Sequence, residues 1–193
     1  MTRQLDAWKG AFGDAYTDRN HPDPLLRERA WRAMLQGLQL RTILEVGSNT
    51  GANLVALERI NPSWRLTGLE PNAHARETAG VCTLNGTATR IPFQDANFDL
   101  VFTCGVLIHV PPEELDAALH ELYRVARQYL LAIEYHADQP TGILYRNQTD
   151  MLWKRNYLQE YLSRFPDLLL RHSGYWTAKD GFDRTTWHLM EKR

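Results

Sequence analysis

Short apolar runs alternate with amphipathic segments through the middle of the chain. The apolar runs predict strands at 42–47, 64–70, 81–86, 98–105 and 129–135. Around them, apolar residues recur at helical spacing, which predicts helices over 24–39, 51–60, 72–79 and 111–126. Prolines near the starts of the first and last of these helices agree with the assignment, because the first helical turn tolerates proline. Strands that alternate with helices indicate βαβ units and a parallel sheet covered on both faces.

Both ends of the chain depart from this alternation. Residues 1–22 are aromatic and charged, and glycines interrupt their periodicity, so we expect an irregular arm or a short helix. A polar stretch at 136–150 precedes a predicted helix over 152–165. Two apolar runs at 168–176 and 185–192 then predict a terminal antiparallel hairpin. The expected fold class is therefore α/β, with a mostly parallel sheet and an antiparallel hairpin at its C-terminal edge.

Composition predicts a single globular domain over residues 1–193. Hydrophobic residues make up 44% and charged residues 23% of the chain, which is typical of folded soluble proteins. The net charge of -1 removes the simplest electrostatic case for a nucleic-acid or membrane partner. No apolar run approaches the ~20 residues that span a bilayer, and the first residues lack the apolar core of a secretory signal. Cys82 and Cys104 form no disulfide framework and no metal-binding pattern, so we expect a cytoplasmic protein without a metal.

Candidate ligand-binding residues follow the predicted strands, because open α/β sheets bind ligands beyond the carboxyl ends of their strands. Glu45 ends the first strand, and Gly47 and Gly51 flank the turn into the next helix, whose free N–H groups favour a bound ligand. The spacing is neither the dinucleotide fingerprint nor a phosphate-binding P-loop. Glu70 ends the second strand, where a carboxylate is suited to accept hydrogen bonds from the two hydroxyls of a ribose.

The third and fourth strands add further candidates. Thr87 and Ala88 follow the third strand and could reach the edge of an adenine. Gly105 and Val106 follow the fourth strand, beneath the expected site. His109 is a candidate base, but a histidine before a proline at a helix start is more often structural, and the sequence favours that interpretation.

With these motifs, the chain resembles the class I methyltransferases that depend on S-adenosylmethionine (SAM). The resemblance covers nearly the whole chain and implies a Rossmann-like fold, with SAM as substrate or co-substrate. It implies that the turn after the first strand holds the methionine part of SAM, although Asn49 replaces the usual middle glycine. The SAM-binding residues predicted in this way are Arg19, Glu45, Gly47, Asn49, Gly51, Asn53, Glu70, Pro71, Thr87, Ala88, Gly105 and Val106.

A narrower resemblance rests on segments such as AFGDAYTDRN, GVLIHVPPEEL, RQYLLAIEY and TTWHLMEK. The chain is similar there to the small methylases associated with pseudaminic acid biosynthesis. It is similar also to the azetidine-2-carboxylate synthases, which cyclise SAM and release methylthioadenosine. The pseudaminic-associated pattern YRG…KRDF is altered, because Asn147 and Asn156 replace its glycine and aspartate, and His136 replaces a second tyrosine. Since an amide cannot act as a base as a carboxylate does, these changes disfavour methyl transfer to a sugar hydroxyl.

Two reactions of SAM fit these residues: cyclisation by its own α-amine, and methyl transfer to a sugar or another small molecule. Both are displacements that need positioning rather than a metal. The sequence favours cyclisation, because Asn156 could hold a neutral amine and a chain of this size leaves little for an acceptor pocket. The predicted catalytic residues are Tyr16, Arg146, Asn156 and Tyr175. Residues 1–22 and 136–157 are expected to form a lid, and a SAM-binding regulatory protein without catalysis is the third alternative.

Overall fold

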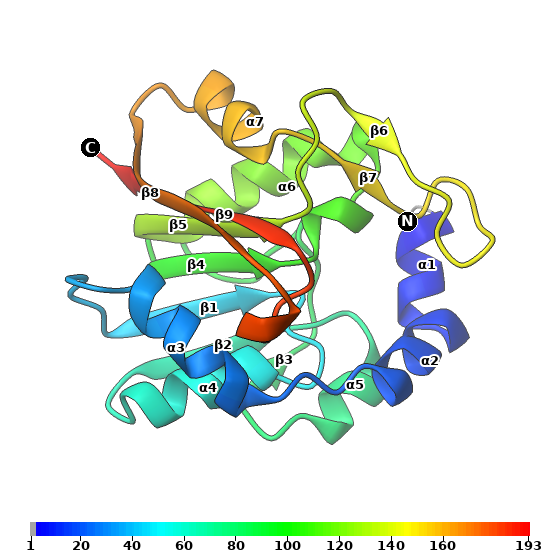
Figure 1. The fold of residues 1–193 in the computed structure, drawn as a ribbon, viewed down its shortest axis with the longest axis horizontal. Coiled ribbons are helices and arrows are strands. Elements are labelled where there is room, and N and C mark those ends of the chain that lie inside the picture. Colours follow the sequence, from blue (N-terminus) through cyan, green and yellow to red (C-terminus); the bar gives the residue numbers. More distant parts are fainter. Residues whose placement is uncertain (1–2) are drawn as a thin grey trace.

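A seven-stranded sheet with the order β3-β2-β1-β4-β5-β9-β8 forms the centre of the protein (Figure 1). The computed structural model describes residues 3–193. Strands β3, β2, β1, β4 and β5 are parallel, whereas β9 and β8 pair antiparallel at one edge. The strands of this sheet are β1 (Thr42–Val46), β2 (Arg65–Leu69), β3 (Thr83–Leu84), β4 (Phe98–Cys104), β5 (Ala126–Glu134), β8 (Leu168–Trp176) and β9 (Thr185–Lys192). The α/β class, the parallel centre and the antiparallel terminal hairpin are all confirmed.

Helices cover both faces of the sheet, and two further helices lie beside its end (Figure 1). The helices α3 and α4 pack on one face, and α6 and α7 pack on the other. The helices are α1 (Arg3–Lys9), α2 (Ala11–Arg19), α3 (Pro24–Met34), α4 (Ala52–Ile60), α5 (Ala73–Thr78), α6 (Pro112–Val125) and α7 (Tyr157–Arg164), with 3-10 turns η1 (Leu107–His109) and η2 (Ala178–Asp180). Among residues 3–193, no helix combines the length and the apolar character that crossing a membrane requires.

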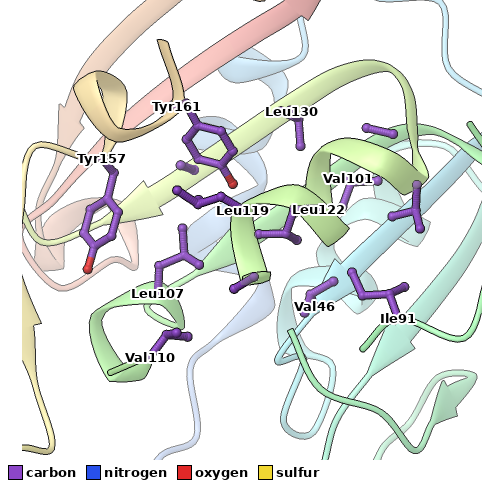
Figure 2. Close-up of a cluster of buried hydrophobic side chains, with 14 of the residues drawn as sticks. Val46, Ile91, Val101, Leu107, Val110, Leu119, Leu122, Leu130, Tyr157 and Tyr161 are labelled. Atoms are coloured by element: carbon purple, nitrogen blue, oxygen red, sulfur yellow. The ribbon is translucent and has the colours of Figure 1, made fainter. Parts of the chain in front are cut away.

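Each face of the sheet buries its own apolar cluster. On the α6 side, Leu119 and Leu122 pack with Tyr157 and Tyr161 of α7 and with Leu130 of β5 (Figure 2). On the α3 side, a second cluster forms around the fully buried Trp31, and it includes Leu54, Leu57 and Phe102. Burying both faces removes the apolar strands from water, which is the main force that holds such a three-layer fold together.

The order of the strands fixes where a ligand site can lie. The chain runs from β1 outward to β2 and β3, then returns to β4 on the other side of β1. Helix α4 leaves the end of β1 toward one face, and α6 follows β4 on the other face. The carboxyl ends of β1 and β4 therefore form a topological switch point, where α/β sheets of this kind leave a crevice.

Two regions differ from the sequence-based expectation. The N-terminal arm is ordered as α1 and α2, which meet at Gly10, the residue before α2 begins. The helix predicted over 152–165 begins only at Tyr157, because the strand β7 (Trp153–Lys154) pairs with β6 (Thr141–Gly142). Periodicity alone missed this small sheet, since it depends on a partner strand more than ten residues earlier in the chain.

Candidate functional site

A cavity opens at the carboxyl ends of β1, β2 and β4, at the switch point of the sheet. The empty space in it, the open mouth included, is about 1220 Å³. Its walls come from the turn after β1, from the segments that follow β2, β3 and β4, and from α1, α2, α3 and the first turns of α4 and α6. Four parallel strand ends and five helices thus converge on one pocket.

The turn after β1 has a backbone that approaches its neighbours closely. Gly47 has a φ of 75°, and a Cβ added there would lie 2.4 Å from a methyl carbon of Val106. Glycine is therefore required on both conformational and steric grounds. Asn49, which replaces the middle glycine usual in the methyltransferases that the sequence resembles, has a φ of 47°. Asparagine is one of the few side chains that tolerates this left-handed conformation, so the turn keeps its shape without the glycine.

Glu45 lies at the base of the cavity and is almost completely buried. Its Oε1 accepts a hydrogen bond of 2.6 Å from Asn53 Nδ2, whereas its Oε2 is buried without a hydrogen-bond partner among residues 3–193. Arg27 of α3 donates to Asn53 Oδ1 at 2.7 Å and to the carbonyl of Gly181 at 2.8 Å. Burial raises the pKa of Glu45 to about 8, against the opposing effects of the Asn53 hydrogen bond and of the Arg27 charge. The base of the cavity therefore holds a carboxyl that favours the neutral form.

Glu70 is the second acidic group of the site, at the end of β2. Its Oε2 accepts the backbone N–H of Asn49 at 2.9 Å, and its Oε1 accepts that of Asn72, also at 2.9 Å. Burial raises its pKa, although both backbone hydrogen bonds and the nearby charge of Arg76 oppose the rise. The two hydrogen bonds fix the plane of the carboxylate, so this cavity-lining group has a set orientation.

A third carboxylate positions the backbone after β4. Glu134, buried at the end of β5, accepts the N–H groups of Val106, Leu107 and Ile108 at 3.1 to 3.3 Å. Burial raises its pKa to about 7, and the three backbone donors oppose that rise. Because these donors are the free N–H groups at the start of η1, Glu134 holds in place the segment that forms one cavity wall.

The N-terminal helices are bonded to the rim of the cavity. The Thr17 hydroxyl donates to Asn49 Oδ1 at 3.1 Å. The Asn72 side chain donates to the carbonyl of Trp8 at 3.0 Å and to Asp14 Oδ1 at 2.7 Å. A Cβ on Gly13 would lie 1.9 Å from the Trp8 carbonyl oxygen, so glycine permits the tight packing between these two helices. Helices α1 and α2 therefore form a wall of the cavity.

Aromatic rings gather where this wall meets η1. The ring of Trp8 lies 4.5 Å from that of His109 and 5.2 Å from that of Tyr16, between centroids. Tyr145 approaches the other side of this group, 5.3 Å from His109 and 6.1 Å from Phe12. Burial raises the pKa of Tyr16, so its phenol stays protonated and can donate a hydrogen bond. This part of the cavity wall is therefore aromatic.

Comparison with known proteins supports one fold family. Residues 44–129 match the model of a family described as a methyltransferase domain. Three solved structures are similar over most of the chain at low sequence identity. They are a Haloferax volcanii protein in complex with the Trm112 methyltransferase activator (15% identity, 100% of this chain and 99% of that chain, TM-score 0.67), a Burkholderia thailandensis 1,6-didemethyltoxoflavin-N1-methyltransferase with S-adenosylhomocysteine (17%, 97% and 85%, TM-score 0.66) and a SAM-dependent methyltransferase of Thermotoga maritima (18%, 100% and 100%, TM-score 0.65). The chain has the fold of the class I methyltransferases. No curated protein matches its sequence.

Most of the residues predicted to bind SAM meet at the cavity of this methyltransferase fold. Those that line it are Glu45, Gly47, Asn49, Asn53, Glu70, Pro71, Thr87, Ala88, Gly105 and Val106, together with the predicted catalytic residue Tyr16. Gly51 lies just behind the wall as the N-cap of α4. Their convergence follows from the parallel sheet, which brings the ends of β1, β2, β3 and β4 to one edge.

Four predicted residues lie outside the cavity lining. Asn156 is the N-cap of α7, where its side chain accepts the N–H of Gln159 at 3.1 Å. Tyr175 is on the edge strand β8 and is 55% exposed. Arg146 sits in a tight turn with a φ of 50°, beside the ring of Tyr145. The guanidinium of Arg19 lies 5.4 Å from the centre of the Tyr16 ring. None of these four residues is among those that line the cavity, and their contact with a ligand stays a prediction.

The structure adds two residues that the sequence did not single out. Arg27 and Asn72 both line the cavity. Asn72 follows Glu70 by two residues, so its position after β2 was a usable signal. Arg27 carried no such signal, because it lies on a helix recognised only by its apolar face, and its partners Asn53 and Gly181 are distant in sequence.

Proposed function

We propose that this protein binds SAM and transfers its methyl group to a small molecule. The observation that carries the proposal is the buried, unpartnered Oε2 of Glu45, which lies at a cavity bordered by glycine backbone. The α-ammonium of SAM supplies both a hydrogen bond and a charge for this oxygen. Close approach of the methionine part to the Gly47 backbone is possible because no side chain intervenes.

The other parts of SAM have matching groups along the same edge. Glu70 is oriented to accept hydrogen bonds from the two ribose hydroxyls, since each of its oxygens keeps lone pairs beyond those used by Asn49 and Asn72. Thr87 and Ala88 lie where an adenine ring would follow the ribose. Arg27, near Glu45 and Asn53, is the group we assign to the SAM carboxylate, because guanidinium and carboxylate form strong paired hydrogen bonds.

Methyl transfer is favoured over the cyclisation that the sequence suggested. One reason for cyclisation was Asn156, whose side chain caps α7 and does not line the cavity. The other was the lack of chain for an acceptor pocket, yet α1 and α2 build an aromatic wall from residues 3–19. The matched family model and the similar structures are described as methyltransferases. All three considerations support an acceptor next to SAM.

Cyclisation remains the second candidate because a positive charge lies near the part of the cavity that we assign to the amino-acid portion of SAM. The guanidinium of Arg27 lies one hydrogen bond from Asn53, which in turn contacts Glu45. A positive charge there lowers the pKa of a neighbouring amine and so favours the neutral form. A neutral α-amine is the nucleophile that cyclisation to azetidine-2-carboxylate requires.

The deciding experiment incubates the purified protein with SAM and no acceptor, followed by mass spectrometry. Methyl transfer predicts that SAM stays intact until an acceptor is added, after which S-adenosylhomocysteine forms. Methylthioadenosine and a cyclic four-carbon amino acid in the first incubation would instead establish the cyclase.

SAM binding is tested separately by isothermal titration calorimetry. Glu70→Gln keeps the shape of the side chain, but its amide N–H group would face one of the two backbone N–H donors that Glu70 accepts. We therefore expect SAM affinity to fall at least about tenfold. Glu77→Gln on the exposed side of α5 is the matched control and should bind SAM as the wild type does. Equal affinity of the Glu70 variant and the wild type would refute the assignment of the ribose site.

A further inference from the structure

His109 lies on the cavity wall, where one of its ring nitrogens forms a hydrogen bond to the main chain and the other is available to a ligand. Its Nδ1 is 2.6 Å from the carbonyl oxygen of Met151. A carbonyl only accepts, so Nδ1 carries the proton, and in a neutral ring Nε2 then presents a lone pair. Within residues 3–193 no protein group forms a hydrogen bond with Nε2, and the residue lines the cavity. The tautomer is thus set by the main chain of the segment before α7.

The ring of His109 is also held in a fixed orientation. It lies between Trp8, at 4.5 Å, and Tyr145, at 5.3 Å between centroids. These two rings come from α1 and from the loop after β6, so they enclose the imidazole from two separate parts of the chain. A hydrogen-bond acceptor on a rigid support, in an apolar surrounding, is worth more than the same group in water.

We propose that His109 Nε2 accepts the hydrogen of the group to be methylated, and that this group is a hydroxyl of an uncharged molecule. This inference rests on the proposed function and names the acceptor class for the same cavity. The aromatic wall favours a planar or apolar molecule.

The transfer balances without any further reactant. A lone pair of the acceptor oxygen forms a bond to the methyl carbon, and the bond from that carbon to sulfur breaks with its electron pair staying on sulfur. The acceptor proton passes to Nε2 and from there to water. Burial lowers the pKa of His109 to about 4, so the imidazole takes the proton late, after methylation has made the acceptor strongly acidic. It cannot remove a proton from an alkylammonium, which agrees with an uncharged acceptor.

Two substitutions test the roles of the two ring nitrogens separately. In His109→Asn, the side-chain amide can still donate to the Met151 carbonyl but reaches no further, so the acceptor at the Nε2 position is lost. In His109→Gln, the longer side chain restores an acceptor near that position. His172→Asn on the exposed strand β8 is the matched control.

The probes are phenol and toluene, which have nearly the same shape and differ in one hydroxyl. Their affinities are measured by NMR titration of the protein, with and without S-adenosylhomocysteine. We expect the preference for phenol over toluene to fall about 3- to 10-fold in His109→Asn, the worth of one neutral hydrogen bond. The preference should persist in His109→Gln and in the control. Equal preferences in the wild type and His109→Asn, or no binding of either probe at the cavity, would overturn the proposal.

A second measurement does not depend on any variant being folded. Nitrogen-15 NMR of the wild-type histidines between pH 5 and 8 should show two neutral, non-titrating rings, because burial lowers the pKa of both His109 and His188 to about 4. The ring assigned to His109 should be protonated at Nδ1. A neutral His109 ring protonated at Nε2, or titration of all 7 histidine rings near the unperturbed pKa of about 6.5, would exclude the role of His109. Calorimetric binding of S-adenosylhomocysteine tests the proposed function alone, so a failure there is distinguishable from a failure of the acceptor assignment.

Discussion

The strongest quantitative prediction concerns the buried carboxyl of Glu45. Burial raises its pKa from 4.5 to about 8, and each tenfold change in an acid dissociation constant corresponds to ~1.4 kcal/mol. A carboxyl whose pKa is raised in the folded state contributes stability in full below the unfolded pKa. That contribution is lost as the pH rises through the folded pKa. Glu45 should therefore destabilise the ligand-free protein progressively between about pH 4.5 and pH 8, by at most about 5 kcal/mol.

The substitution Glu45→Gln removes the titration while keeping the acceptor for Asn53. Water in the open cavity reduces the penalty, so we expect the variant to exceed the wild type in free energy of unfolding by about 2 to 4 kcal/mol at pH 8. At pH 5, where the wild-type carboxyl is already neutral, the two proteins should differ by less than about 1 kcal/mol.

The assay is urea unfolding at pH 5, 6, 7 and 8 without SAM. Glu70 and Glu134 also have raised pKa values, so the wild type loses stability from several groups, and only the difference between the two proteins isolates Glu45. Glu58→Gln on the exposed side of α4 is the matched control, and its free energy of unfolding should depend on pH as that of the wild type does. The same dependence of stability on pH in wild type and Glu45→Gln would refute the reasoning.

Three further predictions follow from the same site. SAM binding near pH 7 should release up to one proton, because the ammonium of SAM favours the ionised form of Glu45. The released proton makes the calorimetric binding enthalpy depend on the buffer, and Glu45→Gln should remove that dependence. Gly47→Ala should cost about 2 kcal/mol or more of unfolding free energy and reduce SAM affinity, because of its positive φ and its contact with Val106. Full stability and affinity in that variant would contradict the steric argument. Asn156→Asp should leave melting temperature and turnover unchanged, since aspartate caps a helix as well as asparagine does; a loss of turnover alone would return Asn156 to the reaction.

The order of strands and the acidic strand ends could be predicted because both depend on local patterns. The apolar runs of β1, β4 and β5 are nearly continuous, as expected of strands buried on both faces, and the helices between them keep a 3.6-residue period. Glu45 and Glu70 end their strands, and parallel strands bring their carboxyl ends to one edge. Hence the position of most of the predicted SAM-binding residues follows from secondary structure and topology.

The far end of the cavity is decided by contacts between distant segments. Trp8, His109 and Tyr145 come together only because α1, η1 and the loop after β6 are packed against one another. The pairing of Arg27 with Asn53 likewise joins α3 to α4, and the short strand β7 delays the start of α7 so that Asn156 becomes a cap. None of these contacts has a periodic or local signature. Local patterns along the chain therefore specify the fold class and the edge where the cavity opens. Packing between distant segments specifies which side chains enclose the cavity, because that packing depends on the whole fold.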